Sequence, residues 1–199
     1  MRLVTFGCSL TQGYGIETQT LQVSDKAWPS ILGKLLNCEV LNYGRGGSSC
    51  KEVHWTLLNH KFKLGDFVIM LWPQTYGRWC VIGRKTIRKY LLSNINDTTA
   101  QQWFDSHYHR EDSLIDLHQR IQHAHCYLNQ QNIKNYHAYT NRLGHMKKYS
   151  WFDVDMLRLD MKQLRTRHPT CKFEGDPHPG EECHEAYAKE LYTYLNVVL

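Results

Sequence analysis

The run Asp-Phe-Val-Ile-Met-Leu-Trp at residues 66–72 is the feature that most restricts the fold. After its first residue the run is apolar at every position, so a strand formed by it would be buried on both faces. Strands of this kind occur in parallel sheets that carry helices on either side. The run therefore predicts a central strand of a parallel sheet.

Strand-like and helical patterns alternate along most of the chain. The strands are predicted at residues 3–6, 39–43, 66–72 and 133–139. The helices are predicted at residues 27–37, 48–60, 112–131 and 181–195, with a shorter one near 153–165. This alternation predicts a mostly parallel sheet covered on both faces, that is, an α/β fold with three layers.

The 199 residues are expected to form one domain, with an insertion at about residues 73–110. The insertion is rich in aromatic and basic side chains, and we expect it to be irregular or partly helical. Its densest basic run, R-K-T-I-R-K at 84–89, is interpreted as a solvated helix face; the alternative is contact with an anionic glycan or nucleic acid.

Composition indicates a cytoplasmic protein. The seven cysteines are odd in number, and none forms a C-x-x-C pair, which fits free thiols in a reducing compartment. The first apolar stretch is too short for a signal peptide, and no run has transmembrane length. The same features fit a bacterial or bacteriophage protein, including one packaged into a virion. The sequence does not indicate an oligomeric state.

Polar and glycine-rich segments follow three of the predicted strands. Ser9 follows the first strand, residues 44–47 follow the second, and W-P-Q-T begins at the end of the third. Because functional groups gather at the carboxyl ends of parallel strands, we expect these three segments to meet at one edge of the sheet. The sequence therefore predicts a site at this edge.

The residue types near this edge are those of a serine hydrolase. Ser9 lies in a tight bend that would present its hydroxyl outward, and the glycines at 44–47 would offer backbone N–H groups. Near the carboxyl terminus, His178 lies two residues after Asp176, between two prolines that would stiffen the loop. We predict Ser9 as nucleophile, His178 as base and Asp176 as its orienting carboxylate; Glu174 is the alternative.

Four segments together resemble the blocks of the SGNH, or GDSL-like, hydrolase superfamily. They are F-G-C-S-L-T-Q-G (6–13), N-Y-G-R-G-G-S-S (42–49), V-I-M-L-W-P-Q-T (68–75) and D-P-H-P-G (176–180). The resemblance implies a flavodoxin-like α/β/α fold and ester hydrolysis through an acyl-enzyme, with no metal or other cofactor. It also implies that the N–H groups of Ser9 and Gly47 bind the oxyanion.

The third and fourth blocks depart from the family pattern. Gln74 stands where the family usually has an asparagine as the third oxyanion donor, and only Pro177 separates Asp176 from His178. The third block also resembles that of a subgroup with the pattern W-x-x-x-x-x-R, in which Arg78 would bind an anionic substrate group. Trp72 and Tyr76 are predicted to form a wall of the substrate cleft, and such aromatic surfaces suit sugar rings.

Other histidines and cysteines are interpreted as structural. His123 and His125 point away from each other on a helix, so no metal site is predicted there. His184 is expected to pack on the last helix. Cys8 is expected to fill space beside Ser9, since a cysteine nucleophile would need a base of its own.

The leading hypothesis is a serine esterase or O-deacetylase, whose substrate is a small-molecule or glycan ester such as an acylated carbohydrate. The alternative is an inactive binding module with the same fold, for a glycan or another anionic ligand. A nucleic-acid partner rests only on modest positive charge and aromatic residues, and no membrane partner is indicated.

Overall fold

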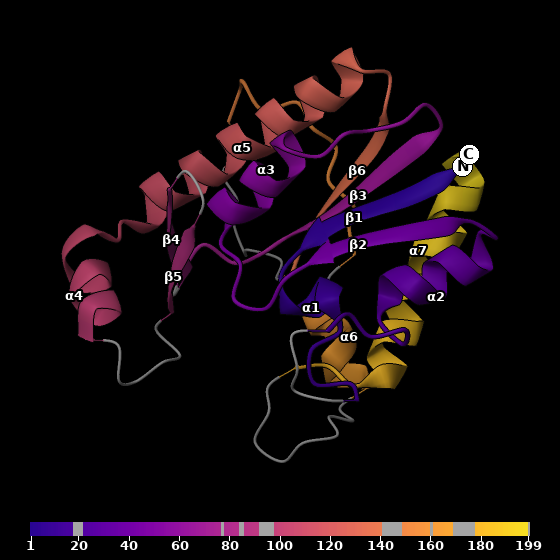
Figure 1. Cartoon of the computed structure of the whole chain (residues 1–199), viewed down its shortest axis with the longest axis horizontal. Helices are drawn as coiled ribbons and strands as arrows, with labels where there is room; N and C mark the ends of the chain where they lie inside the picture. The colour runs from indigo at the N-terminus through magenta and orange to yellow at the C-terminus, as the bar shows by residue number, and fades with distance from the viewer. Residues whose placement is uncertain are drawn as a thin grey trace.

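The computed structural model describes residues 1–17, 22–76, 78–83, 86–91, 98–140, 149–159, 161–168 and 178–198. At its centre lies a four-stranded sheet in which every neighbouring pair of strands is parallel. The strand order is β2 (Glu39–Gly44), β1 (Arg2–Gly7), β3 (Asp66–Trp72) and β6 (Lys134–Tyr139). The predicted parallel sheet is confirmed (Figure 1).

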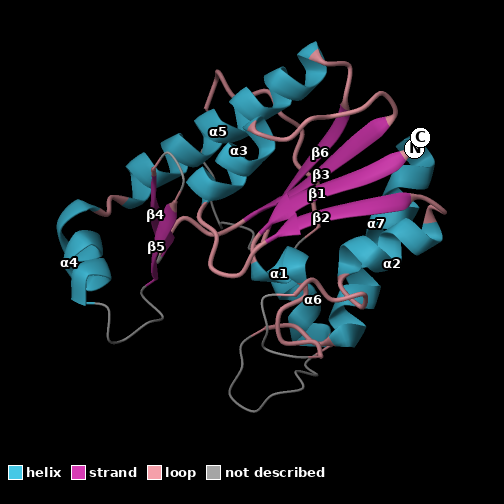
Figure 2. Cartoon of the chain, viewed as in Figure 1, coloured by secondary structure: helices cyan, strands magenta, loops and turns pink. Residues whose placement is uncertain are grey.

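Helices cover both faces of this sheet, as Figures 1 and 2 show. On one face lie α2 (Trp28–Leu35), α6 (Met161–Arg167) and α7 (Glu181–Val198). On the other face lie α3 (Cys50–Leu58) and α5 (Arg110–Gln130). The short helix α1 (Ser9–Gln12) follows β1 at the carboxyl end of the sheet. The fold is thus the predicted three-layer α/β/α sandwich with flavodoxin-type topology.

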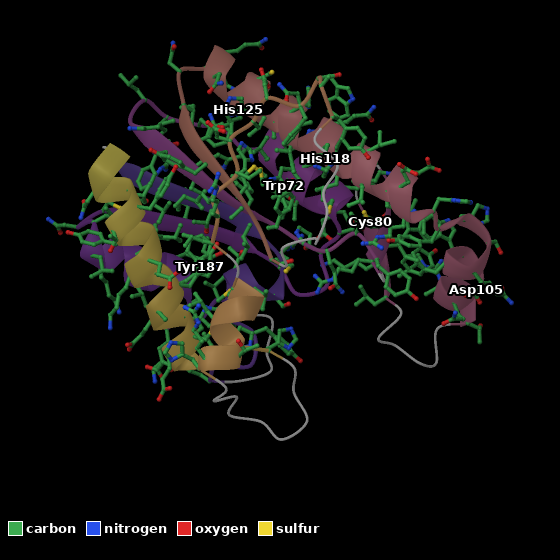
Figure 3. The ribbon with its side chains drawn as sticks, turned by 180° about the vertical axis from the view of Figure 1, so that it is seen from behind. Trp72, Cys80, Asp105, His118, His125 and Tyr187 are labelled. Carbon is green, nitrogen blue, oxygen red and sulfur yellow. The ribbon has the colours of Figure 1, made fainter. Side chains whose placement is uncertain are left out.

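Strand β3 explains why the sheet needs two helical layers. Its side chains are buried throughout and alternate between two cores, because successive residues of a strand point to opposite faces. Ile69 and Leu71 pack toward α7, whereas Met70 and Trp72 pack toward α5. Figure 3 shows Tyr187 of α7 on one side, and Trp72 and His118 on the other.

Segment 73–110 contains an antiparallel hairpin that the sequence did not predict. Its strands are β4 (Arg78–Ile82) and β5 (Ile87–Leu91), and helix α4 (Thr98–His107) follows. Trp79 of β4 stacks on Trp103 of α4, with ring centroids 4.3 Å apart. Figure 2 shows the hairpin and α4 beyond the carboxyl ends of the central strands. The interpretation of 84–89 as a helix face was wrong, since 87–89 belong to β5.

The other predicted elements agree with the structure within a few residues, with one exception. The short helix predicted near 153–165 begins only at Met161. Residues 153–159 are not helical, and Met156 instead forms a parallel bridge to His137 of β6. No helix within the described ranges has the length and apolar character needed to cross a membrane.

Candidate active site

Ser9 stands at the turn between β1 and α1, directly beyond the carboxyl end of the sheet. It is the first residue of α1, and Cys8 is the N-cap. The backbone N–H groups of Thr11 and Gln12 already donate to the Cys8 carbonyl. The N–H of Ser9 lies too near the helix start to have an intrahelical acceptor, so its position suits an external anion.

The close approach of β1 to α1 requires a glycine before this turn. A Cβ on Gly7 would overlap the side chain of Thr11 and would stand 3.0 Å from the carbonyl oxygen of Leu71 on β3. Cys8 is buried beside Ser9, with 1% of its surface exposed, and Ser9 itself is only 3% exposed. The hydroxyl of Ser9 is therefore held in a tightly packed bend.

His178 reaches Ser9 from the other end of the sequence. It lies three residues before α7 begins, and its Nε2 is 2.9 Å from Ser9 Oγ. The ring of Tyr14, which follows α1, lies against the His178 imidazole with centroids 4.9 Å apart. With Nε2 as the acceptor of the serine proton, this pair has the geometry of a nucleophile and its general base.

The loop after β2 is tied to the turn that carries Ser9. The amide of Asn42 donates to the Thr11 carbonyl (2.7 Å) and accepts from the N–H of Gly44 (2.8 Å). Gln12 Oε1 accepts the N–H of Gly46 at 2.5 Å. These bonds place Gly47 beside the serine turn; its φ of +71° is a conformation that favours glycine.

The hairpin packs on the far side of the same loop. Arg78 Nη1 donates to the carbonyl of Ser48 (3.3 Å), and Lys89 Nζ donates to the carbonyl of Gly46 (2.8 Å). The Ser49 hydroxyl donates to Cys80 Sγ at 3.1 Å, and Cys80 is labelled in Figure 3. The loop that contains Gly47 is thus held between α1 and the hairpin.

Three solved structures resemble the fold of this chain over nearly its whole length. They are an acetyl xylan esterase, AlAXEase (12% identity, TM-score 0.55, covering 98% of this chain and 100% of that chain); a carbohydrate acetylesterase family member from Sinorhizobium meliloti (13%, 0.53, 98% and 97%); and a member of the lipolytic protein G-D-S-L family from Veillonella parvula DSM 2008 (13%, 0.52, 97% and 98%). The chain has an SGNH-like fold. No protein-family model and no curated protein matches the sequence.

Within this fold, the structure brings three predicted site residues together and buries a fourth in the core. Ser9, His178 and the loop of Gly47 meet at the carboxyl edge of the sheet, as the contacts above establish. The expectation that Trp72 lines a cleft is corrected. Its indole is fully buried in the core, where Nε1 donates to His137 Nδ1 at 3.1 Å.

The remaining predicted residues have varied environments. Gln74 is exposed on the loop after β3, and Tyr76 is 54% exposed while its ring packs against Phe104 and Tyr108. Arg78 is half-buried, and its guanidinium donates to the Ser48 carbonyl on the loop after β2. Asp176 and Glu174 lie outside the described residues.

His184 lies on α7 one turn beyond the His178 loop and is fully buried. Its Nδ1 accepts the backbone N–H of Trp28 at 3.2 Å. Burial, together with the nearby His178, lowers the pKa of His184 to about 3, so the ring is neutral at pH 7. It is a packing residue, as predicted, and not a second base.

Sequence reasoning missed Tyr14, Gln12 and Lys89. The position of Gln12 was a usable signal. It lies three residues after Ser9, and residues three apart on a helix lie on the same side. Lys89 carried none, since it was one of several basic residues in a run. The contact of Lys89 depends on strand pairing in the hairpin, which brings this residue to the loop after β2.

The histidine-rich part of α5 does not form a metal centre among the described residues. His123 Nδ1 lies 2.8 Å from His54 Nε2, whereas His125 Nδ1 bonds Asn135 Oδ1 at 2.8 Å. The two rings therefore have different partners, on α3 and β6. Within the described ranges, no three histidine, cysteine, aspartate or glutamate side chains are grouped closely enough to hold a metal ion.

Proposed function

We propose that this protein is a serine ester hydrolase, of the esterase or O-deacetylase type, that acts through an acyl-enzyme. The observation that carries the proposal is the 2.9 Å contact between Ser9 Oγ and His178 Nε2, at the carboxyl edge of a parallel sheet. A serine hydroxyl is a weak nucleophile until a neighbouring base accepts its proton. In this proposal His178 is that base, and Asp176 or Glu174 is the carboxylate that orients it.

The proposed reaction has two steps. Ser9 Oγ attacks the ester carbonyl carbon while its proton passes to His178 Nε2, and the same proton then leaves with the departing alcohol. In the second step water attacks the acyl carbon and gives a proton to His178, which returns it to Ser9 as the acid is released. The proposed reaction uses no metal or other cofactor.

The oxyanion of both steps would be bound by backbone N–H groups. Ser9 N–H is at the start of α1, and Gly47 N–H is on the loop that Gln12 ties to α1. Gln74 is the proposed third donor, and its side chain is exposed on the loop after β3. Each donor of this kind contributes about 10²–10³-fold in kcat.

An acylated carbohydrate is the proposed substrate class. Two of the similar solved structures are an acetyl xylan esterase and a carbohydrate acetylesterase family member. The exposed ring of Tyr76, at the base of the hairpin, offers a flat apolar surface beyond the third strand on which a sugar ring can stack. Arg78 is the proposed contact for an anionic substituent, if the sugar has one.

The test is p-nitrophenyl acetate turnover by wild type, Ser9→Ala and His178→Ala, with intact-mass detection of a fluorophosphonate adduct. The matched controls are Ser106→Ala and His107→Ala, which remove the same side chains from the exposed end of α4. We expect one adduct on wild type and the controls, no adduct on Ser9→Ala, and a loss of kcat of roughly 10⁴–10⁶-fold in both site variants.

The same assay distinguishes the esterase from the inactive binding module. A folded wild type that shows neither turnover nor adduct would contradict the esterase proposal and would favour the inactive binding module. If turnover is found, acetate release from acetylated xylan is compared with release from p-nitrophenyl acetate. The absence of acetate release from acetylated xylan, by a wild type that hydrolyses p-nitrophenyl acetate, would contradict the carbohydrate assignment.

A further inference from the structure

The peptide group between Gly46 and Gly47 is bound on its carbonyl side by a lysine of the hairpin. Lys89 Nζ donates to the Gly46 carbonyl oxygen at 2.8 Å. That oxygen and the N–H of Gly47 belong to the same planar trans peptide, in which they point in opposite directions. Fixing the carbonyl oxygen therefore fixes the direction in which Gly47 presents its N–H.

Lys89 is itself held in place by a buried carboxylate. Glu52, near the start of α3, is 1% exposed, and its Oε1 lies 3.1 Å from Lys89 Nζ, outside hydrogen-bond alignment. Lys89 is the nearer of two cations to this oxygen, since the guanidinium of Arg45 lies 3.9 Å from it. The Lys89 side chain is 28% exposed. A buried charge needs a partner, so Glu52 favours the conformation in which Lys89 reaches the loop.

A second residue of β5 contacts the other end of this peptide. A Cβ on Gly47 would stand 2.9 Å from Leu91 Cδ1, so the Leu91 side chain lies directly over the Gly47 Cα. Lys89 and Leu91 are two residues apart and therefore lie on the same face of β5. The hairpin thus contacts both the carbonyl oxygen of Gly46 and the Cα of Gly47.

We propose that Lys89 is a positioning residue for the oxyanion site, acting through the Gly46–Gly47 peptide. This inference rests on the proposed function. The ammonium charge orients the peptide and also draws electron density toward the carbonyl oxygen, which makes the Gly47 N–H a stronger donor. Lys89 does not touch the substrate. The sequence run 84–89 thus includes one lysine whose role lies in the site.

The kinetic test compares Lys89→Met with the matched control Arg88→Met. Arg88 is exposed on the same strand, with its guanidinium 5.2 Å from the Tyr90 ring centroid. We expect Lys89→Met to lower kcat for p-nitrophenyl acetate about 10–100-fold with KM within about twofold, since losing a whole donor costs about 10²–10³-fold. Lys89→Arg should recover part of the loss, and Arg88→Met should match wild type.

A further variant separates positioning from stability. Lys89→Met leaves the Glu52 carboxylate without its near ammonium, so it can unfold the protein for that reason alone. The double variant Lys89→Met/Glu52→Gln removes both charges and is expected to be folded, with the same loss of kcat. A double variant with the thermal stability and the kcat of wild type would overturn the inference.

The second readout does not depend on turnover. In ¹⁵N-labelled protein, the amide signal of Gly47 should shift in Lys89→Met and in the double variant, but not in Arg88→Met. An unshifted signal would overturn the inference whether or not the protein hydrolyses esters. A wild type without turnover would instead contradict the proposed function, and the Gly47 signal alone would then decide whether Lys89 holds this peptide.

Discussion

Replacing His184 with asparagine should make the protein less sensitive to acid. The His184 side chain is fully buried, and its Nδ1 accepts the N–H of Trp28. A proton added to Nδ1 would face that N–H group and would place a charge in the core. Asparagine can offer its Oδ1 where histidine offers Nδ1, so His184→Asn keeps an acceptor for Trp28 but cannot take up the proton.

The size of the effect follows from the pKa of His184 in the folded and unfolded states. Burial lowers the folded-state pKa to about 3, against about 6.5 in an unfolded chain. The unfolded chain therefore binds more protons between these values. The stability that His184 contributes is fully present above pH 6.5 and is lost as the pH falls toward 3. Between pH 7 and pH 5 the loss amounts to about 2 kcal/mol.

The assay is urea unfolding at pH 7 and pH 5, followed by tryptophan fluorescence and by circular dichroism. The free energy of unfolding of His184→Asn should fall about 2 kcal/mol less than that of wild type between the two pH values. The control His109→Asn removes an exposed histidine and should show the full wild-type decline. An equal decline in His184→Asn and wild type would refute the assignment of His184 as a buried neutral residue.

Three further predictions follow from buried contacts. Burial lowers the pKa of His137 to about 3, so His137→Asn should also lose about 2 kcal/mol less than wild type from pH 7 to pH 5 in the same assay; an equal loss would contradict this. Gly44→Ala should destabilise by about 1–3 kcal/mol in thermal unfolding, because its Cβ would overlap the backbone N of Gln12; an unchanged Tm would be evidence against this packing. Gln12→Ala removes the acceptor of the Gly46 N–H and should lower kcat about 10-fold, whereas Gln12→Glu retains an acceptor; equal kcat in Gln12→Ala and wild type would exclude the role.

Local patterns were sufficient to predict the central sheet. The run at residues 66–72 became β3 with the predicted bounds, because a strand that is apolar on both faces is stable only between two helical layers. The sequence also predicted where the chain would turn, since glycines and short polar residues follow the strands. The position of Ser9 at the end of β1 is therefore a property of the local sequence.

The hairpin could not be predicted in the same way. Its strands are only half-buried, and their basic and aromatic residues fit neither a clear period of two nor one of 3.6. The pairing of β4 with β5 and the packing of Trp79 on Trp103 define this region. The sequence likewise predicts Trp72 on a cleft wall, because an aromatic residue at a strand end is compatible with a cleft or with the core until its neighbours are placed.

The sequence by itself determined the layered fold and the edge of the sheet at which polar residues gather, because these depend on the periodicity of apolar side chains and on turns between near neighbours. Only the tertiary structure decided which of those residues touch. The contact between Ser9 and His178 joins residues 169 positions apart, and the bond from Lys89 to Gly46 joins strand β5 of the hairpin to the loop after β2. Such contacts depend on chain packing across the whole sheet, which no local pattern encodes.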